Sequence, residues 1–129
     1  MSGETDLRRL LDSLSADLQP GRYVFTTVAR VLPDLAPVVI VREPEGVTLV
    51  LDQDEAERNG LAYEYVAAMV TLRVHSSLEA VGLTAAVATA LTERGISCNV
   101  VSGYYHEHLF VPFDRGQETV DVLTALSRA

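Results

Sequence analysis

The sequence predicts an α+β protein with ferredoxin-like topology that is repeated imperfectly along the chain. Short runs of alternating apolar and polar residues indicate strands, and apolar residues three and four apart indicate helices. In the second half the order is strand, helix, strand, strand, helix, which is the ferredoxin-like order without its last strand. Because an unpaired strand edge would then be exposed, we expect the first half to supply the missing partner.

The composition is that of a globular protein with an acidic surface. The 129 residues are 48% hydrophobic and 22% charged, which fits one ordinary domain or two very small ones. Acidic residues outnumber basic ones by 18 to 10, and the net charge of −8 disfavours binding to nucleic acid or anionic lipid. With no apolar stretch long enough to cross a membrane and no secretory signal, we expect a cytoplasmic protein.

The first elements are a helix, a strand and a loop. Leucines three and four residues apart predict a helix over Leu7–Leu18. The segment Tyr23–Val31 is rich in β-branched and aromatic residues and predicts a strand. Because proline fixes φ twice within Pro33–Pro37, this segment is predicted to be a loop.

A hairpin and a short helix complete the first half. The apolar runs Val38–Arg42 and Val47–Leu51 flank Glu43-Pro44-Glu45-Gly46, whose proline and glycine predict a tight turn. Neither run alternates cleanly, which predicts strands buried on both faces. The charged segment Asp52–Asn59 favours a helix, which Gly60 would end.

The second half shows sharper patterns. Alternation predicts strands over 66–74, 96–100 and 106–113, and helical spacing predicts a helix whose apolar face starts at Leu83. A last helix is predicted over Asp114–Arg128, capped by Asp114. We expect two mutually dependent units, residues 1–62 and 63–129.

The segments Arg73–Ala85, Leu91–Ser97 and Asn99–Ser102 form a strand, a loop with glycine, a helix ending in glycine and a further strand start. This pattern resembles the ACT domain and covers about half of the chain. The segments Arg42–Gly46 and His106–Pro112 resemble small stand-alone bacterial ACT proteins of unknown function. The tail pattern is also similar to the paired ACT repeats of aspartokinases and of a cytosolic arginine sensor.

The resemblance implies a regulatory, allosteric module that binds an amino acid and pairs side by side with another unit. It places the ligand between the loop from His75 to Thr84 and the strand Asn99–Ser102 of a neighbouring unit. The implied binding residues are His75, Ser77, Glu79, Ala80, Val81, Gly82, Leu83, Thr84, Asn99, Val100 and Ser102. No cofactor and no enzymatic activity are implied, and the regulated protein is unknown.

The residues of this loop, considered without the family resemblance, also suit a free amino acid. Unpaired N–H groups at the start of the Leu83 helix favour a carboxylate, and Gly82 lets a ligand approach the backbone. Glu79 is able to accept a hydrogen bond from an ammonium group. Ser76 and Glu79 also have the spacing of a capping box, so capping and ligand binding are both open interpretations of Glu79.

A metal site is an alternative. His106 and His108 share one face of a strand, and His75 lies on the polar face of the strand expected beside it. Three imidazoles and water are a ligand set for zinc or nickel, so a histidine-based metal-binding protein or enzyme stays open. Histidines in such pairs are more often solvated or interface residues.

A purely structural role is the other alternative, in which the chain is a dimerisation or protein-interaction module without a ligand. We expect a homodimer in either case, because a twofold partner commonly buries an exposed sheet edge. Cys98 is in phase with Ile96 and Val100 and is predicted to be an inert core residue.

Overall fold

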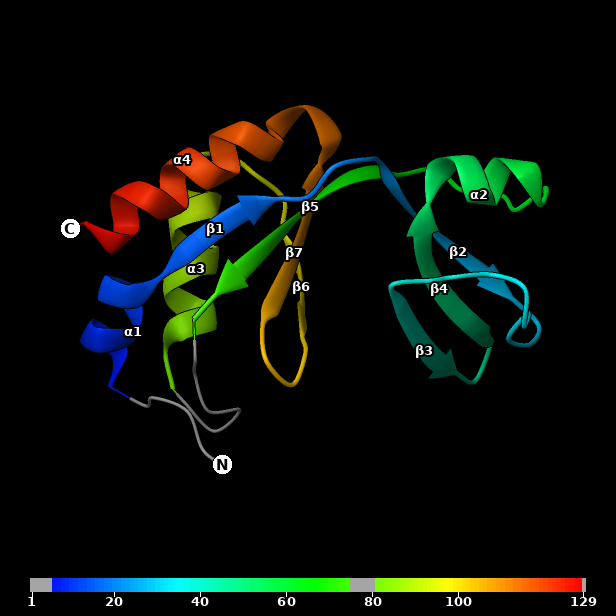
Figure 1. The fold of residues 1–129 in the computed structure, drawn as a ribbon, viewed down its shortest axis with the longest axis horizontal. Coiled ribbons are helices and arrows are strands. Elements are labelled where there is room, and N and C mark those ends of the chain that lie inside the picture. Colours follow the sequence, from blue (N-terminus) through cyan, green and yellow to red (C-terminus); the bar gives the residue numbers. More distant parts are fainter. Residues whose placement is uncertain (1–5, 75–80, 129) are drawn as a thin grey trace. The chain divides into compact units, whose positions relative to one another are not determined.

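Residues 6–74 and 81–128 are described by the structure, a computed structural model of the chain. The chain divides into two compact units. Unit 1 comprises residues 1–20 and 68–129, and unit 2 comprises residues 21–67. Strand β5 (Val66–Arg73), green in Figure 1, begins in unit 2 and continues into unit 1.

Unit 1 is a four-stranded sheet with helices. Its elements are α1 (Leu7–Ser13), β1 (Ser15–Leu18), β5 from Ala68, α3 (Leu83–Thr92), β6 (Asn99–Ser102), β7 (Glu107–Pro112), a 3₁₀ turn (Phe113–Arg115) and α4 (Gly116–Ser127). The strand order is β1-β5-β7-β6. From β5 onward the chain follows the ferredoxin-like sequence of elements, and β1 takes the place of the last strand.

The predicted helix over Leu7–Leu18 is wrong in its second half. The helix α1 ends at Ser13, and Leu14 is already extended, with φ −65° and ψ 130°. Residues Ser15–Leu18 form β1, which pairs antiparallel with β5 so that Ser15 lies opposite Arg73. Hydrogen bonding to an otherwise open strand edge outweighs the helical spacing of the leucines. The expectation that the first half completes this sheet is confirmed.

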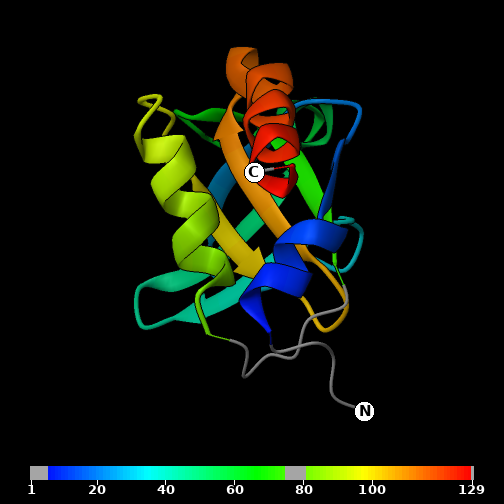
Figure 2. The same ribbon diagram turned by 90° about the vertical axis from the view of Figure 1, so that its left-hand side faces the viewer.

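The three helices and one face of the sheet enclose the core of unit 1 (Figure 2). Its buried members come from every helix and from the central strands: Leu10, Leu11, Leu14, Ala68, Val70, Leu72, Val74, Leu83, Val87, Leu91, Ile96, Leu109, Val111, Val122 and Leu123. Of the leucines that the helical spacing singled out, Leu10, Leu11 and Leu14 therefore face the core, whereas Leu7 and Leu18 are 36% and 41% exposed.

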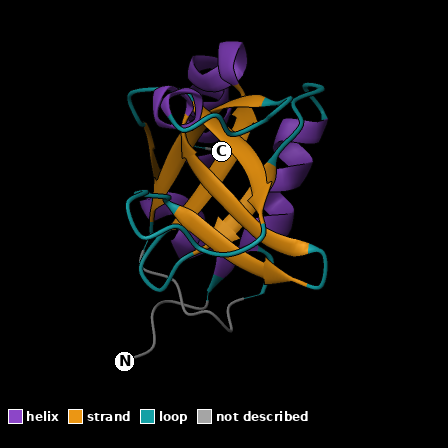
Figure 3. Cartoon of the chain, turned by 90° about the vertical axis from the view of Figure 1, so that its right-hand side faces the viewer, coloured by secondary structure: helices purple, strands orange, loops and turns teal. Residues whose placement is uncertain are grey.

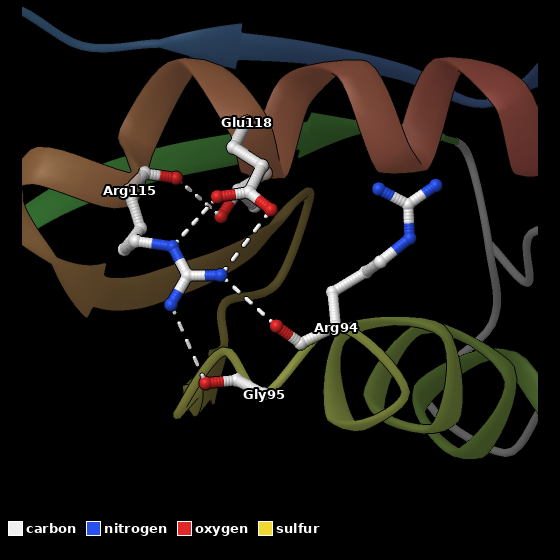
Figure 4. Close-up of polar contacts among 5 residues, drawn as sticks. Arg94, Gly95, Arg115 and Glu118 are labelled. Carbon is white, nitrogen blue, oxygen red and sulfur yellow. Dashed lines mark hydrogen bonds and ion pairs between the residues drawn. The ribbon is translucent and has the colours of Figure 1, made fainter.

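Arg115 connects the end of α3 to the start of α4 (Figure 4). Its guanidinium pairs with Glu118, with Nε 2.6 Å from Oε1 and Nη2 3.2 Å from Oε2. Nη2 also donates to the carbonyl oxygen of Arg94 at 2.9 Å, and Nη1 donates to that of Gly95 at 3.5 Å. Arg94 and Gly95 follow Glu93, the C-cap of α3, so Arg115 fixes the turn after α3 to the start of α4.

The hydrogen bond between the Arg115 and Glu118 side chains raises the pKa of Arg115 and lowers the pKa of Glu118, so both stay charged at neutral pH.

The prediction that Asp114 caps the last helix, α4, is wrong. A 3₁₀ turn precedes α4, Arg115 occupies the N-cap position, and no side chain makes a capping hydrogen bond there. The Arg115–Glu118 pair holds this end of the helix instead of Asp114.

Unit 2 has the same topology without one helix. It contains β2 (Tyr23–Val28), β3 (Val39–Glu43), β4 (Gly46–Asp52), α2 (Gln53–Arg58) and the first two residues of β5. The strand order is β3-β4-β2-β5, with Tyr23 opposite Ala67. Figure 3 draws the strands in orange and the loops that join them in teal. In a complete ferredoxin-like unit a helix would join β2 to β3. Here a loop over 29–38 joins them, which confirms the imperfect repeat.

The loop over 29–38 covers the apolar core of unit 2. Val31 and Leu35 of the loop pack against buried Val24, Val47, Leu49, Leu51 and Ala56. The backbone N–H of Ala36 donates to the Glu55 carboxylate of α2 at 3.1 Å. The strand predicted to reach Val31 ends at Val28, because the chain turns into this loop.

The hairpin and the helix of unit 2 lie where the sequence predicts them, with β3 and β4 antiparallel. Asp52 caps α2 by accepting from the N–H groups of Asp54 and Glu55. Burial of β3 on both faces is wrong, since Ile40 and Val41 are 43% and 45% exposed. The strand lies at the edge of the sheet, so one side of it has no neighbouring strand among the described residues. None of the helices in the described residues is long and apolar enough to cross a membrane.

Replacing Gly116 with alanine should test the packing of α4 on β1 and β5. An added Cβ would lie 2.8 Å from Leu18 Cδ1 and 3.0 Å from Ala68 Cβ. Overpacking costs about 1–3 kcal/mol, and alanine regains about 1 kcal/mol in helix propensity. We expect G116A to lower the free energy of unfolding by ~1 kcal/mol in chemical denaturation. The loss should be smaller in an L18A background, and an equal loss there would contradict this packing.

Candidate functional site

The N-terminal end of α3 is the centre of the candidate site. Gly82 is the N-cap of this helix in the left-handed region, with φ +100°, and as a glycine it has no side chain to make a capping hydrogen bond. A Cβ at this position would lie 3.2 Å from Leu7 Cδ2, so both the conformation and the space favour glycine. The first N–H groups of a helix have no intrahelical acceptor, and they point out of the helix beside Gly82.

A buried carboxylate lies against the first turn of α3. Glu107, the first residue of β7, is 8% exposed and accepts a hydrogen bond from the Thr84 hydroxyl, 3.0 Å from Oε1. The positive end of the helix dipole favours a negative charge at this place. The site thus combines backbone N–H donors with a carboxylate that is shielded from solvent.

Sequence reasoning missed Glu107, although a signal for it exists. Glu107 is in phase with Leu109 and Val111, which both face the core. A charged residue on the apolar face of a strand is rarely buried without a partner. The partner, Thr84, lies 23 residues earlier in the chain, so the pairing itself emerges only from the fold.

Three of the predicted binding residues lie near this carboxylate. Gly82 and Thr84 begin α3, and Ser102 of β6 lies directly opposite Glu107 across the β6–β7 pairing. Directly opposite residues on antiparallel strands point to the same face of a sheet. The structure therefore brings Gly82, Thr84 and Ser102 to one place.

The other predicted binding residues lie elsewhere or are not described. Leu83 is buried in the core of unit 1, and Val100 packs against that core. Both side chains therefore contribute to core packing and do not face a ligand. Asn99 is exposed at the far end of β6, opposite Phe110, and Val81 is 83% exposed. His75, Ser77, Glu79 and Ala80 lie outside the described residues.

Cys98 packs beside the same core as predicted. Burial, and then the nearby charge of Glu107, raise the pKa of its thiol to about 11. The thiol is therefore protonated at neutral pH, and a protonated thiol is a poor nucleophile and metal ligand.

Two of the three candidate metal ligands are described. His108 is half-buried and its Nδ1 lies 3.1 Å from the hydroxyl oxygen of Thr71, while His106 is exposed. Burial, and then the neighbouring His106, lower the pKa of His108 below its ordinary value of 6.5. Groups of three or more metal-ligating side chains do not occur within residues 6–74 and 81–128. His75, the third candidate, lies outside these ranges.

Two ferredoxin-like units, one complete and one lacking a helix, place the chain among proteins with tandem repeats of this topology. The chain belongs to the ACT-domain family. Residues 2–68 match one sequence profile of the ACT domain, and residues 64–125 match a second. The resemblance noted for the second half is thereby confirmed, and it extends to the first half. None of the curated proteins that were compared matches this chain.

Solved structures agree with this assignment. A protein of unknown function from Vibrio cholerae, described as a possible transport protein, is 48% identical, with a TM-score of 0.85 over 94% of this chain and 95% of its own. The regulatory subunit of aspartate kinase from Thermus thermophilus is 9% identical, with a TM-score of 0.65 over 86% of this chain and 95% of its own. At that identity the second likeness shows the fold alone.

The stability of this protein should depend on the protonation of His108. Because its pKa is lower in the folded chain, the unfolded chain binds more protons just below pH 6.5, and the free energy of unfolding should fall as the pH drops from there. We expect H108Q to flatten this dependence in denaturation curves between pH 7 and 5. H106Q is the control and should keep most of it, because burial is the larger cause. An unchanged slope in H108Q would contradict the assignment.

Proposed function

We propose that this protein is a stand-alone regulatory ACT-domain protein, not an enzyme, that binds a free amino acid at the N-terminal end of α3. The observation that carries the proposal is the position of the buried Glu107 carboxylate, 3.0 Å from the Thr84 hydroxyl in the first turn of a helix whose N-cap residue is Gly82. A free amino acid presents a carboxylate and an ammonium group side by side, and this arrangement offers a partner to each.

The carboxylate of the ligand would bind the backbone N–H groups after Gly82. These groups lack intrahelical acceptors, and the helix dipole favours an anion beside them. Glycine at the cap adopts the positive φ with which the helix begins. The Cβ side of Gly82 is filled by Leu7, 3.2 Å from where a Cβ would lie, so the ligand would approach the N–H groups away from Leu7.

The ammonium group would bind Glu107, with Ser102 and Thr84 as neutral neighbours. The Thr84 hydroxyl uses one acceptor site of the Glu107 carboxylate, and an ionised carboxylate offers about four. An ammonium group would therefore add a charge-assisted hydrogen bond beside that of Thr84. Glu79, from the segment that the structure does not describe, stays a second candidate for this role.

Thermal-shift measurements on dialysed protein with each proteinogenic amino acid would test this proposal. A ligand at about a hundred times its Kd stabilises by roughly 2.7 kcal/mol, which corresponds to a rise in Tm on the order of 10 °C. We expect one amino acid, or a few related ones, to give such a rise. E107Q keeps the shape of the side chain and should weaken binding about 10- to 100-fold.

Glu93 provides a matched control, because it lies exposed at the opposite end of α3. E93Q changes the net charge equally and should leave the ligand-induced rise intact. A rise of full size in E107Q would exclude Glu107 from the site. A flat response of the native chain to all amino acids would refute amino-acid binding and favour the structural module.

We further propose that the chain acts as a homodimer and transmits ligand binding to a partner protein. An edge strand with exposed apolar side chains supports this, since Val38, Ile40 and Val41 of the β3 region are 43–48% exposed. Such edges are commonly covered by a second copy. Light scattering during size exclusion should give twice the chain mass of 14.0 kDa. A mass of 14.0 kDa at micromolar concentration would contradict the dimer.

A further inference from the structure

The core-side face of the edge strand β3 is partly open to solvent. Ile40 lies directly opposite Leu49 of β4, and directly opposite residues on antiparallel strands point to the same face of a sheet. Leu49 is fully buried in the core of unit 2, whereas Ile40 is 43% exposed. Val38, two residues earlier, is 48% exposed. Large apolar side chains thus remain uncovered on the side of the sheet that elsewhere forms the core.

Unit 1 shows what covers the corresponding strand there. Strand β6, like β3, is the second strand of its unit and lies at the edge of the sheet. Helix α3 precedes it, and Ala86 and Ala90 of this helix pack against the same core as Val100 of β6. In unit 2 the loop over 29–38 stands in place of such a helix and leaves Ile40 exposed. The cover that β3 lacks is therefore a helix.

The outward face of α3 has an unusual composition for a surface helix. None of the ten residues of α3 is charged, whereas α1, α2 and α4 each carry at least two charged side chains. Ala85, Thr89 and Thr92 are exposed, and their spacing of four and three residues places them on one face. Surface helices normally present charged residues to solvent, so a helix without any is typical of one that packs on this side too.

We propose that the core-side face of β3 receives α3 of a second copy, which takes the position of the helix that unit 2 lacks. The small side chains of Ala85 and Thr89 allow the helix to approach Ile40 closely, and no charge on the helix has to leave water. Because the two surfaces differ, a dimer closes when each copy gives its α3 to the other. The inference rests on the homodimer proposed above and assigns its contact surfaces.

A charge placed on β3 tests the first surface. The α3 face offers no cation to a carboxylate, so I40D should raise the Kd of the dimer at least tenfold in sedimentation velocity. V41D is the matched control, because Val41 is 45% exposed on the same strand but lies opposite Thr48, on the other face of the sheet. Its Kd should stay within threefold of the native value. Equal weakening in both variants would overturn the proposal.

A charge placed on α3 tests the second surface. A85R adds a long cationic side chain to the outward face of the helix and should also raise the Kd at least tenfold. A125R makes the same change at an alanine that is exposed on α4, and it should leave the dimer intact. Far-UV circular dichroism confirms that each variant is folded. A dimer of native affinity in A85R would overturn the proposal.

Mixing I40D with A85R separates this arrangement from pairing between two β3 edges. In the mixed dimer one contact is native, and in the other the new carboxylate at position 40 meets the new guanidinium at position 85. Native mass spectrometry should therefore detect a mixed dimer, although each variant alone is monomeric. A native dimer without a mixed one would overturn the α3 contact alone, whereas a monomeric native chain would refute the homodimer itself.

Discussion

The pairing of β1 with β5 is the constraint on which unit 1 depends. Strand β5 is central to that unit, and without β1 its edge from Val70 to Arg73 would have no partner there. The same four residues of β1 connect α1 to the sheet, so that Leu10, Leu11 and Leu14 reach the core. The core in turn fixes α3, whose first turn carries the candidate site. An early segment of the chain thus determines the geometry of a site formed by residues 82–107.

In unit 1, a glycine and a buried carboxylate determine the chemistry of the candidate site. Gly82 leaves the start of α3 open, and Glu107 brings a carboxylate to it. At the other end of the same helix, Arg115 satisfies the carbonyl groups of Arg94 and Gly95. Arg115 thus fixes the turn that follows α3, whereas the first N–H groups of the helix are those to which we propose that a ligand binds.

Much of the fold could be predicted from the sequence, because strand alternation and the helical spacing of leucine are local signals. The end of α1 at Ser13 could not, since it depends on a strand edge more than 50 residues away. The Gly82 loop was recognisable from its glycine and its family pattern. Glu107 could be recognised as a charged residue on the apolar face of a predicted strand, but its partner Thr84 could not.

The order of elements also has a kinetic consequence. Unit 2 is continuous in sequence, whereas unit 1 is interrupted by it. During synthesis, residues 21–67 are complete before most of unit 1 exists, and they are able to fold first because their contacts are local. The segment β1 must wait until β5 has emerged, with its apolar residues unburied meanwhile. Unit 2 interrupts unit 1 in the sequence without harm to the finished protein. While the chain is being made, however, this interruption makes the N-terminal segment the part most prone to misassembly.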